Sequence, residues 1–261
     1  MLTVISPAKK LDWTPVSLDR ATEPELKTDA NKLAKVAKEL SASELRAMMK
    51  ISEPLAQLNV ERFRAFMSRP NDNVVKPAAL AFDGDTYAGL QARSFDDATM
   101  AFAQDHLRIL SGLYGLLRPM DRMQPYRLEM GSRIATERGA SLYAWWGDKI
   151  AKALNKQAKE TGATTLLNCA SQEYFGAVDR KALKIDVIEP VFLEEAEGEA
   201  KTISFFAKRA RGAMARFAME NRIEDADDLR AFDLDGYRFR ADGSVNGRLV
   251  FTRPRPEAKA A

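Results

Sequence analysis

The sequence opens with MLTVISPAKK (residues 1–10), in which a short apolar run leads into Ser6-Pro7 and then into two lysines. Such a run is typical of a buried strand, and proline ends the strand because it has no N–H group to donate to a sheet. The stretch therefore predicts a buried strand over Met1–Ile5. Its carboxyl end leads into a polar loop that carries Lys9 and Lys10.

Further strands and helices follow along the chain. The predicted strands are Ala78–Phe82, Thr164–Cys169, Leu183–Phe192 and Ala200–Phe206, followed by a hairpin of Tyr237–Arg240 with Arg248–Thr252. The predicted helices are three within Glu23–Ser68, then Asp96–Leu110, Leu142–Glu160 and the basic stretch Lys208–Arg222. This order predicts a mixed α/β fold, α+β-like, with a central mixed sheet and surrounding helices. We expect a single domain over residues 1–253 and a flexible tail over 254–261.

The composition excludes several kinds of chemistry. The chain has 261 residues with one cysteine, Cys169, and one histidine, His106. A single cysteine forms no internal disulfide and fits a reducing compartment, so we expect a cytoplasmic protein. No segment resembles a signal peptide or a membrane span, and we expect no membrane partner. With so few soft ligands we expect no metal site and no cofactor, and we interpret His106 as structural.

Positive charge is concentrated in one helix. The net charge is only +3, yet Lys208–Arg222 holds five basic residues and one acidic residue, whereas Glu224–Asp235 holds six acidic residues and one basic residue. A helical wheel places Lys208 and Arg211 opposite an apolar stripe, with Arg209 at its flank. One interpretation is a solvated surface. The other is a site for a polyanion, favoured by the scarcity of acidic partners four residues away.

The segment Ser111–Gly115 has the outline of the turn in a helix-hairpin-helix element. Gly112 and Gly115 would let backbone N–H groups approach a phosphate closely, and Arg118 and Arg127 follow where phosphate contacts are wanted. The alternative is an ordinary stop between two helices.

Polar residues gather after three of the predicted strands. They are Ser6, Lys9 and Lys10 after the first, Asp83 and Asp85 after the second, and Asn168, Ser171 and Glu173 after the third. Open α/β sheets bind ligands at the carboxyl ends of their strands, so these residues predict a pocket. Turn formation and helix capping are the alternative roles.

Several long stretches together resemble a known family. They are ISPAKKLD (5–12), LAFDGDTYAGL (80–90), HLRILSGLYGLLRPMDRMQPYRLEMG (106–131), NCASQEYF (168–175), EPVFLEE (189–195) and ISFFAKRARGAMARF (203–217). The chain resembles the YaaA peroxide-stress family, also known as UPF0246. The resemblance implies a bacterial cytoplasmic protein, induced by hydrogen peroxide, that limits DNA damage and lowers free intracellular iron.

The resemblance also implies DNA binding through a helix-hairpin-helix element and a positively charged cleft. By position, the hairpin is Ser111–Gly115. The cleft candidates are Lys9, Lys10, Arg118, Arg127, Lys208, Arg209 and Arg211.

Two functions follow as hypotheses. The first is a DNA-binding stress protein whose partner is double-stranded or structured DNA, with affinity dominated by phosphate contacts. The second is an enzyme acting on nucleic acid or a nucleotide, for example one that removes a base. In the second, Asp83, Asp85 or Glu173 would stabilise a cationic centre or activate water, Lys9 would act as a nucleophile and Tyr126 would stack on the base.

Overall fold

The first strand lies inside the central sheet. The computed structural model describes residues 1–245 and 247–256. β1 (Leu2–Ile5) runs parallel to β8 (Thr165–Cys169) on one side and to β5 (Leu107–Ser111) on the other. All four residues of β1 are buried. The predicted first strand is therefore confirmed as a core strand of the sheet.

In the described part of the chain the central sheet has eight strands, ordered β11-β12-β9-β8-β1-β5-β6 with β10 paired to β9. The strands from β12 to β5 are mutually parallel, and β6, β10 and β11 run antiparallel to their neighbours. The remaining strands of this sheet are β6 (Gly115–Leu117), β9 (Asp186–Ala196), β10 (Glu199–Lys201), β11 (Arg238–Val245) and β12 (Arg248–Pro254). Two small sheets pair β2 (Lys10–Leu11) with β4 (Phe82–Asp83) and β3 (Lys76–Pro77) with β7 (Arg122–Met123).

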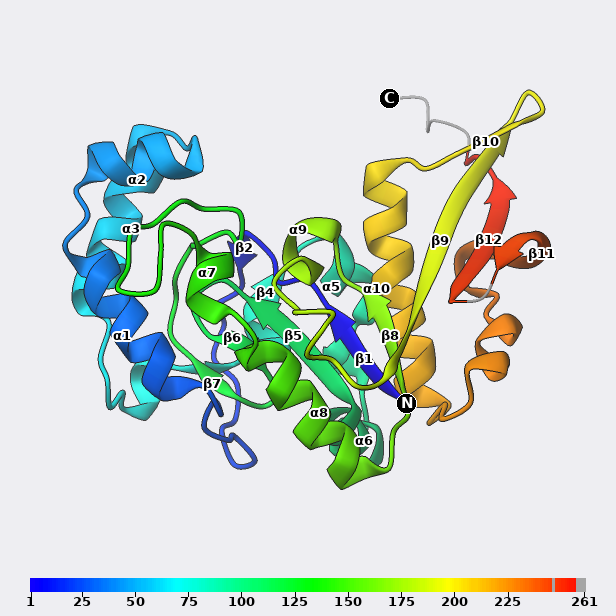
Figure 1. Cartoon of the computed structure of the whole chain (residues 1–261), viewed down its shortest axis with the longest axis horizontal. Helices are drawn as coiled ribbons and strands as arrows, with labels where there is room; N and C mark the ends of the chain where they lie inside the picture. Colours follow the sequence, from blue (N-terminus) through cyan, green and yellow to red (C-terminus); the bar gives the residue numbers. More distant parts are fainter. Residues whose placement is uncertain (246, 257–261) are drawn as a thin grey trace.

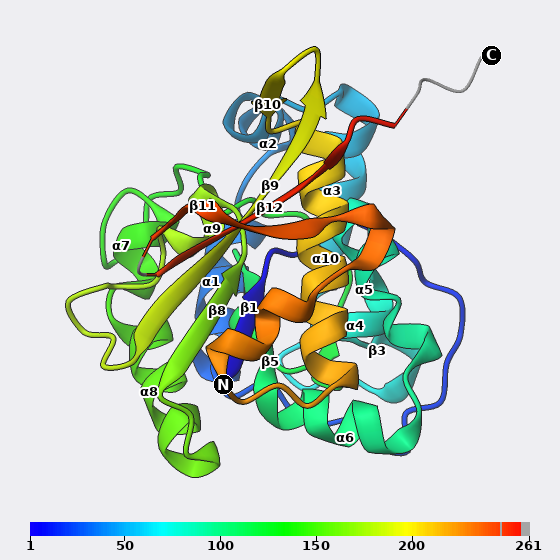
Figure 2. The ribbon, with the colours of Figure 1, turned by 90° about the vertical axis from the view of Figure 1, so that its right-hand side faces the viewer.

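Helices cover both faces of the sheet. The α-helices are α1 (Lys27–Lys38), α2 (Ala42–Met49), α3 (Glu53–Ala65), α4 (Ala78–Ala81), α5 (Asp85–Leu90), α6 (Asp97–His106), α7 (Leu142–Trp146), α8 (Lys149–Thr161), α9 (Gln172–Phe175) and α10 (Ser204–Glu220). The 3-10 helices are η1 (Asp72–Val74), η2 (Ala92–Ser94), η3 (Ala226–Ala231) and η4 (Leu234–Gly236). α7 and α8 lie on one face, whereas α5, α6 and α10 lie on the other (Figures 1 and 2). α1 to α3 form a group at the end of the molecule farthest from β12 (Figure 1).

Most of the predicted elements are confirmed. Three helices occupy Glu23–Ser68, Thr164–Cys169 contains a strand, and the late hairpin forms between β11 and β12. Gly162 follows α8 with φ 73°, a left-handed conformation that suits glycine and ends the helix. The predicted helix Leu142–Glu160 is divided into α7 and α8 at Gly147, whose φ is 47°. The α/β class with a mixed central sheet is thus confirmed.

Three predicted elements are wrong. Ala78–Phe82 was expected to be a strand, but its alanines form α4, because alanine favours helix and a short buried run fits either structure. The helix expected over Asp96–Leu110 ends at His106, since Leu107–Ser111 pairs with β1. The strand expected over Ala200–Phe206 ends at Lys201, and α10 begins at Ser204.

The helix-hairpin-helix prediction at Ser111–Gly115 is also wrong. This segment joins β5 to the antiparallel strand β6, so it is the turn of a β-hairpin. The apolar residues before and after this segment are compatible with either helices or buried strands. They form strands because they pair within the central sheet. A tight connection between two helices occurs instead at Lys50–Ser52, between α2 and α3.

The first residues of the segment expected to be a tail, 254–261, pair with the central sheet. Pro254 belongs to β12, and the backbone N–H of Arg255 donates to the carbonyl of Glu195 at 2.9 Å. Residues 257–261 lie outside the described part of the chain. Within residues 1–245 and 247–256, no helix is both long and apolar enough to cross a membrane.

Candidate functional site

A cavity of about 410 Å³ opens at the carboxyl ends of β1 and β8, beside α5 and α10; we call it the strand-end cavity. It gathers residues from five distant parts of the sequence. The predicted residues that line it are Ser6, Lys9, Lys10, Asp83, Asp85, Ser171, Glu173, Lys208 and Arg211. The structure therefore brings most of the polar residues that follow the predicted strands together around one cavity, and α10, the basic helix, forms one of its walls.

The ends of β1 and β8 are tied together inside the cavity. The backbone N–H of Ser171 donates to the Ser6 hydroxyl at 2.9 Å, and the two hydroxyl oxygens are 3.3 Å apart. The Ser171 hydroxyl also caps α9 by accepting from the N–H of Tyr174 at 3.4 Å. The Ser6 carbonyl accepts from the Tyr87 hydroxyl at 3.2 Å. Ser6 and Ser171 thus fix the two loops that follow the strands.

The two lysines after β1 are exposed and held by carboxylates. Lys10 Nζ lies 2.5 Å from Asp83, its register partner across β2 and β4, and this contact raises the pKa of Lys10. Lys9 Nζ lies 3.3 Å from Glu129, which also accepts from Arg127 at 2.9 Å. Carboxylates therefore orient both lysines toward the cavity mouth.

Glu129 is a site residue that the sequence reasoning missed. It lines the cavity and links Lys9 to Arg127, whose own side chain is largely buried outside the cavity. It lies in the irregular segment after β7, which has no periodic pattern and follows none of the predicted strands. Its only sequence signal is its place two residues after an arginine.

The basic residues of α10 are not equivalent. Arg209 pairs with Asp235 at 3.2 Å, and Arg216 pairs with Glu220 at 2.8 Å and also donates to Gln91. Lys208 and Arg211 line the strand-end cavity, and among the described residues no carboxylate lies within ion-pair distance of either side chain. The cavity wall thus carries two cations that no carboxylate of the described residues compensates.

Two glycines bring α10 against α5 and so shape this wall. A Cβ atom on Gly212 would lie 1.8 Å from the Thr86 carbonyl oxygen, and one on Gly89 would lie 2.0 Å from the carbonyl oxygen of Arg209. Larger residues would separate the helices. The close crossing holds Asp85, at the first turn of α5, beside the cavity that Lys208 and Arg211 line.

The carboxylates of the cavity differ in their partners. Glu173 accepts from the backbone N–H of Gly131 at 2.9 Å. The side chain of half-buried Asp85 makes no hydrogen bond or ion pair with the described residues. Asp83 and Glu129, by contrast, are neutralised by lysines. Asp85 and Glu173 are therefore the carboxylates open to a ligand.

Two glycines and one arginine predicted for DNA contact lie elsewhere. A Cβ on Gly112 would meet the Leu128 carbonyl oxygen at 2.1 Å, and one on Gly115 would meet the Trp146 ring at 2.7 Å, so both positions serve packing. Arg118 pairs with buried Asp121 at 2.9 Å. It lies toward the amino end of the parallel strands, because β6 runs antiparallel to β5.

Two predicted pocket residues also lie outside the strand-end cavity. Tyr126 is buried, and its hydroxyl lies 2.6 Å from that of Ser111, so its ring does not face the cavity. Asn168 lines a second cavity of about 540 Å³, which we call the neighbouring cavity. Its side-chain amide donates to Glu189 at 2.9 Å. Asn168 and Cys169 line different cavities because consecutive residues of a strand, here β8, point to opposite faces of the sheet.

Cys169 lines the strand-end cavity but is 2% exposed. Burial raises the pKa of its thiol to about 12, although nearby Arg211 opposes the shift. A thiol in this state is a poor nucleophile at neutral pH. His106 is structural, as predicted: its Nδ1 lies 2.9 Å from the Met1 carbonyl oxygen and its ring stacks on Phe102.

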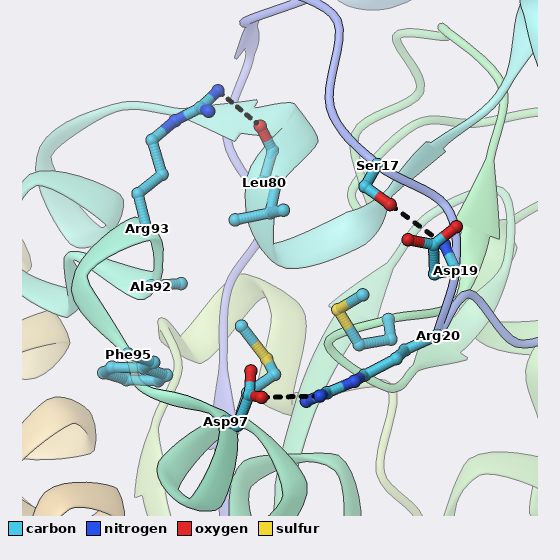
Figure 3. A pocket seen from close by; sticks show the side chains of 10 residues that line it. Ser17, Asp19, Arg20, Leu80, Ala92, Arg93, Phe95 and Asp97 are labelled. Carbon is cyan, nitrogen blue, oxygen red and sulfur yellow. Dashed lines mark hydrogen bonds and ion pairs between the residues drawn. The ribbon is translucent and has the colours of Figure 1, made fainter.

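Another hollow lies away from these strands (Figure 3). Three of its four charged side chains already have partners: Arg20 pairs with Asp97 at 2.6 Å, and Arg93 pairs with Asp12 at 2.5 Å. We therefore do not regard it as the functional site. Among residues 1–245 and 247–256, no group of three or more His, Cys, Asp or Glu side chains is arranged to hold a metal ion.

Fold and site together define a mixed α/β protein with an ion-rich cavity at the carboxyl ends of its central parallel strands. A family model described as "Peroxide stress protein YaaA" matches residues 1–243, and the chain belongs to this family. The resemblance inferred from the sequence is thereby confirmed.

Bacterial relatives match over nearly their full length. A UPF0246 protein of Dinoroseobacter shibae is 58% identical over 261 residues, which cover 100% of this chain and 98% of the relative. A UPF0246 protein of Cereibacter sphaeroides is 58% identical over 97% of this chain and 99% of its own length. One from Phenylobacterium zucineum is 53% identical over 100% and 98%.

Proposed function

We propose that this member of the YaaA family is a cytoplasmic, DNA-binding peroxide-stress protein that holds double-stranded or structured DNA at the strand-end cavity. The observation that supports this most is the pair of uncompensated cations, Lys208 and Arg211, in the cavity wall. Phosphates are the groups in DNA that such cations bind. In the cell, this binding would limit oxidative DNA damage and accompany a lowering of free iron.

The loop after β1 supplies further phosphate contacts. Lys9 and Lys10 are exposed at the mouth of the same cavity, and their side chains are 66% and 78% exposed. Their ion pairs with Glu129 and Asp83 are surface pairs, which contribute little to stability and are exchanged for phosphate at small cost. Arg209 is only half exposed and pairs with Asp235, so we assign it a smaller contribution.

A matched pair of double variants on α10 tests the proposal. Lys208→Ala with Arg211→Ala removes the two uncompensated cations, whereas Arg209→Ala with Arg216→Ala removes two paired ones from the same helix. We expect the first variant to bind duplex DNA more weakly. The slope of log K against log salt should flatten by about 0.9 for each lost phosphate contact.

The control variant should lose much less affinity than the first and keep a steeper salt slope, because its two arginines are engaged by carboxylates. Equal losses of affinity in both variants would mean that binding depends only on net charge. That result would contradict the assignment of Lys208 and Arg211 as the DNA-binding site. Failure of the natural chain to bind duplex DNA at low salt would contradict the function itself.

A second function is an enzyme that acts on a nucleotide held in the same cavity, such as a base-removing enzyme. The observation in its favour is that Asp85 and Glu173 line a cavity in which Asp83 and Glu129 are already neutralised. A carboxylate without a cationic partner is available to stabilise positive charge or to activate water. Lys9 would act as a nucleophile only after leaving its ion pair with Glu129.

Incubating the chain with duplexes that carry damaged bases tests this alternative. Product should form with the natural chain and fall at least about a hundredfold in Asp85→Asn if the carboxylate acts in general acid–base chemistry. Tight binding with no product at high protein concentration would reject the enzyme and leave the DNA-binding function standing.

A further inference from the structure

The strand-end cavity and the neighbouring cavity are separated by a single stretch of chain. Along Asn168–Glu173, alternate residues line alternate cavities: Cys169, Ser171 and Glu173 line the first, and Asn168, Ala170 and Gln172 line the second. Arg211 lines both. One arginine side chain therefore stands between two hollows of about 410 and 540 Å³.

The neighbouring cavity has the mixed lining of a site for a flat polar ring. Phe175, Val178 and Val191 supply apolar surface, and Asn168 and Glu189 supply hydrogen-bonding groups. Asp179 and Arg180 also line the cavity, and the Arg180 guanidinium lies 5.7 Å from the centre of the Phe175 ring. The Asn168 amide is fixed, because its nitrogen donates to Glu189 at 2.9 Å and its oxygen accepts from the N–H of Ala170 at 3.1 Å. Sites of this kind orient a ligand with a few placed polar groups among apolar side chains.

Arg211 has the properties of an anion anchor. Its side chain is partly buried, and none of the described residues provides a carboxylate partner for it, in contrast to Arg209 and Arg216. The planar guanidinium presents several N–H donors in a fixed fork that matches a phosphate. An anionic group between the two cavities would supply the missing partner.

We propose that the two cavities bind two successive unpaired nucleotides of a DNA strand, with the phosphodiester that joins them held by Arg211. This inference rests on the proposed function and makes it specific, since it names the part of the ligand that each cavity receives. One nucleoside lies against Phe175 and Asn168, and the other lies beside Asp85 and Glu173.

The thymidine dinucleotide d(TpT) and its neutral methylphosphonate analogue test the inference, because they differ only in the linkage, where a methyl group replaces the charged oxygen. With the natural chain, NMR titration should show d(TpT) binding about tenfold more tightly than the analogue, as expected for a charge-assisted contact. Amide signals from both cavities, such as those of Gly84 and Val191, should shift together.

The Arg211→Gln variant should bind the two dinucleotides equally. Arg211→Lys should keep part of the preference, since it keeps the charge and loses the fork. Arg216→Gln is the matched control on the same helix, because its side chain is engaged by Glu220 and Gln91 and lines neither cavity. Thermal melting of each variant checks that it is folded.

The same preference for d(TpT) in Arg211→Gln would overturn the inference. So would shifts confined to one cavity, or binding of duplex DNA by the natural chain without binding of d(TpT). In those cases the proposed DNA-binding function stands. If the natural chain binds neither duplex DNA nor d(TpT), the proposed function fails as well.

Discussion

At the scale of single residues, the site depends on which charges have partners. Lys208 and Arg211 lack them among the described residues, whereas Arg209 and Arg216 are paired with Asp235 and Glu220. Carboxylate partners on the protein compete with phosphates for the same cation. Whether a basic side chain of this helix is free to bind a phosphate therefore depends on its ion-pair partners and not on its position along the helix.

Cys169 gives a prediction at this scale. Because burial raises the pKa of its thiol to about 12, the thiolate is scarce at neutral pH. We expect the native chain to react with iodoacetamide or hydrogen peroxide far more slowly than the unfolded chain, as measured by mass spectrometry. Equal rates in the native and unfolded states would show that this thiol is reactive and a candidate sensor of peroxide.

The same thiol predicts a pH dependence of stability. Its pKa is higher in the folded chain than its ordinary value of 9.0, so the unfolded chain loses this proton first as the pH rises. The stabilising contribution is complete below pH 9 and decreases above it. Urea unfolding should show a smaller alkaline loss for Cys169→Ala than for the natural chain. An identical loss would contradict the assignment.

At the scale of elements, the crossing of α5 and α10 positions the cavity wall. Gly212 and Gly89 allow the two backbones to approach, which places Asp85 and Arg211 beside one cavity. The crossing therefore couples packing to the site, because a wider separation would move the carboxylate and the guanidinium apart.

Gly212→Ala should therefore destabilise the fold. The added methyl group would lie 1.8 Å from the Thr86 carbonyl oxygen, and overpacking of this kind costs about 1–3 kcal/mol. Chemical denaturation measures the loss. Lys208→Ala is the control on the same helix, and we expect a change of less than about 0.5 kcal/mol because Lys208 is exposed. Equal stability of both variants would contradict the close crossing.

A buried carboxylate on β9 ties the sheet to the start of α10. Glu194 accepts from the Tyr237 hydroxyl and from the N–H of Ile203 at 3.2 Å, and it pairs with Arg253 at 3.4 Å. Glu194→Ala leaves the Arg253 charge largely buried without its partner, so we expect a loss of about 3–5 kcal/mol. Unchanged stability in urea unfolding would show that Arg253 finds another partner.

The elements also show how far the sequence could be interpreted. Met1–Ile5 and Thr164–Cys169 were predicted because short apolar runs bounded by turn residues indicate strands. Leu107–Leu110 was assigned to a helix because Leu-Arg-Ile-Leu fits either structure, and only the pairing of this segment with β1 shows that it is a strand. Arg118 was misplaced for a related reason, since its position depends on the antiparallel direction of β6.

At the scale of the whole molecule, the parallel centre of the sheet brings the site together. The carboxyl ends of β1 and β8 share one edge, so residues after position 5 and after position 169 meet although they are far apart in sequence. This rule is why Ser6, Lys9, Ser171 and Glu173 were predicted as neighbours. Glu129 was missed because it comes from an irregular segment that no strand rule covers.

Hydrogen exchange of the full chain with and without duplex DNA tests the central claim most directly. We predict slower exchange at the ends of β1 and β8, at the start of α5 and in the first half of α10, which enclose the strand-end cavity. The hollow in Figure 3, around Arg20 and Arg93, should not change. Protection confined to that hollow or to α8, with none at the strand-end cavity, would contradict the account.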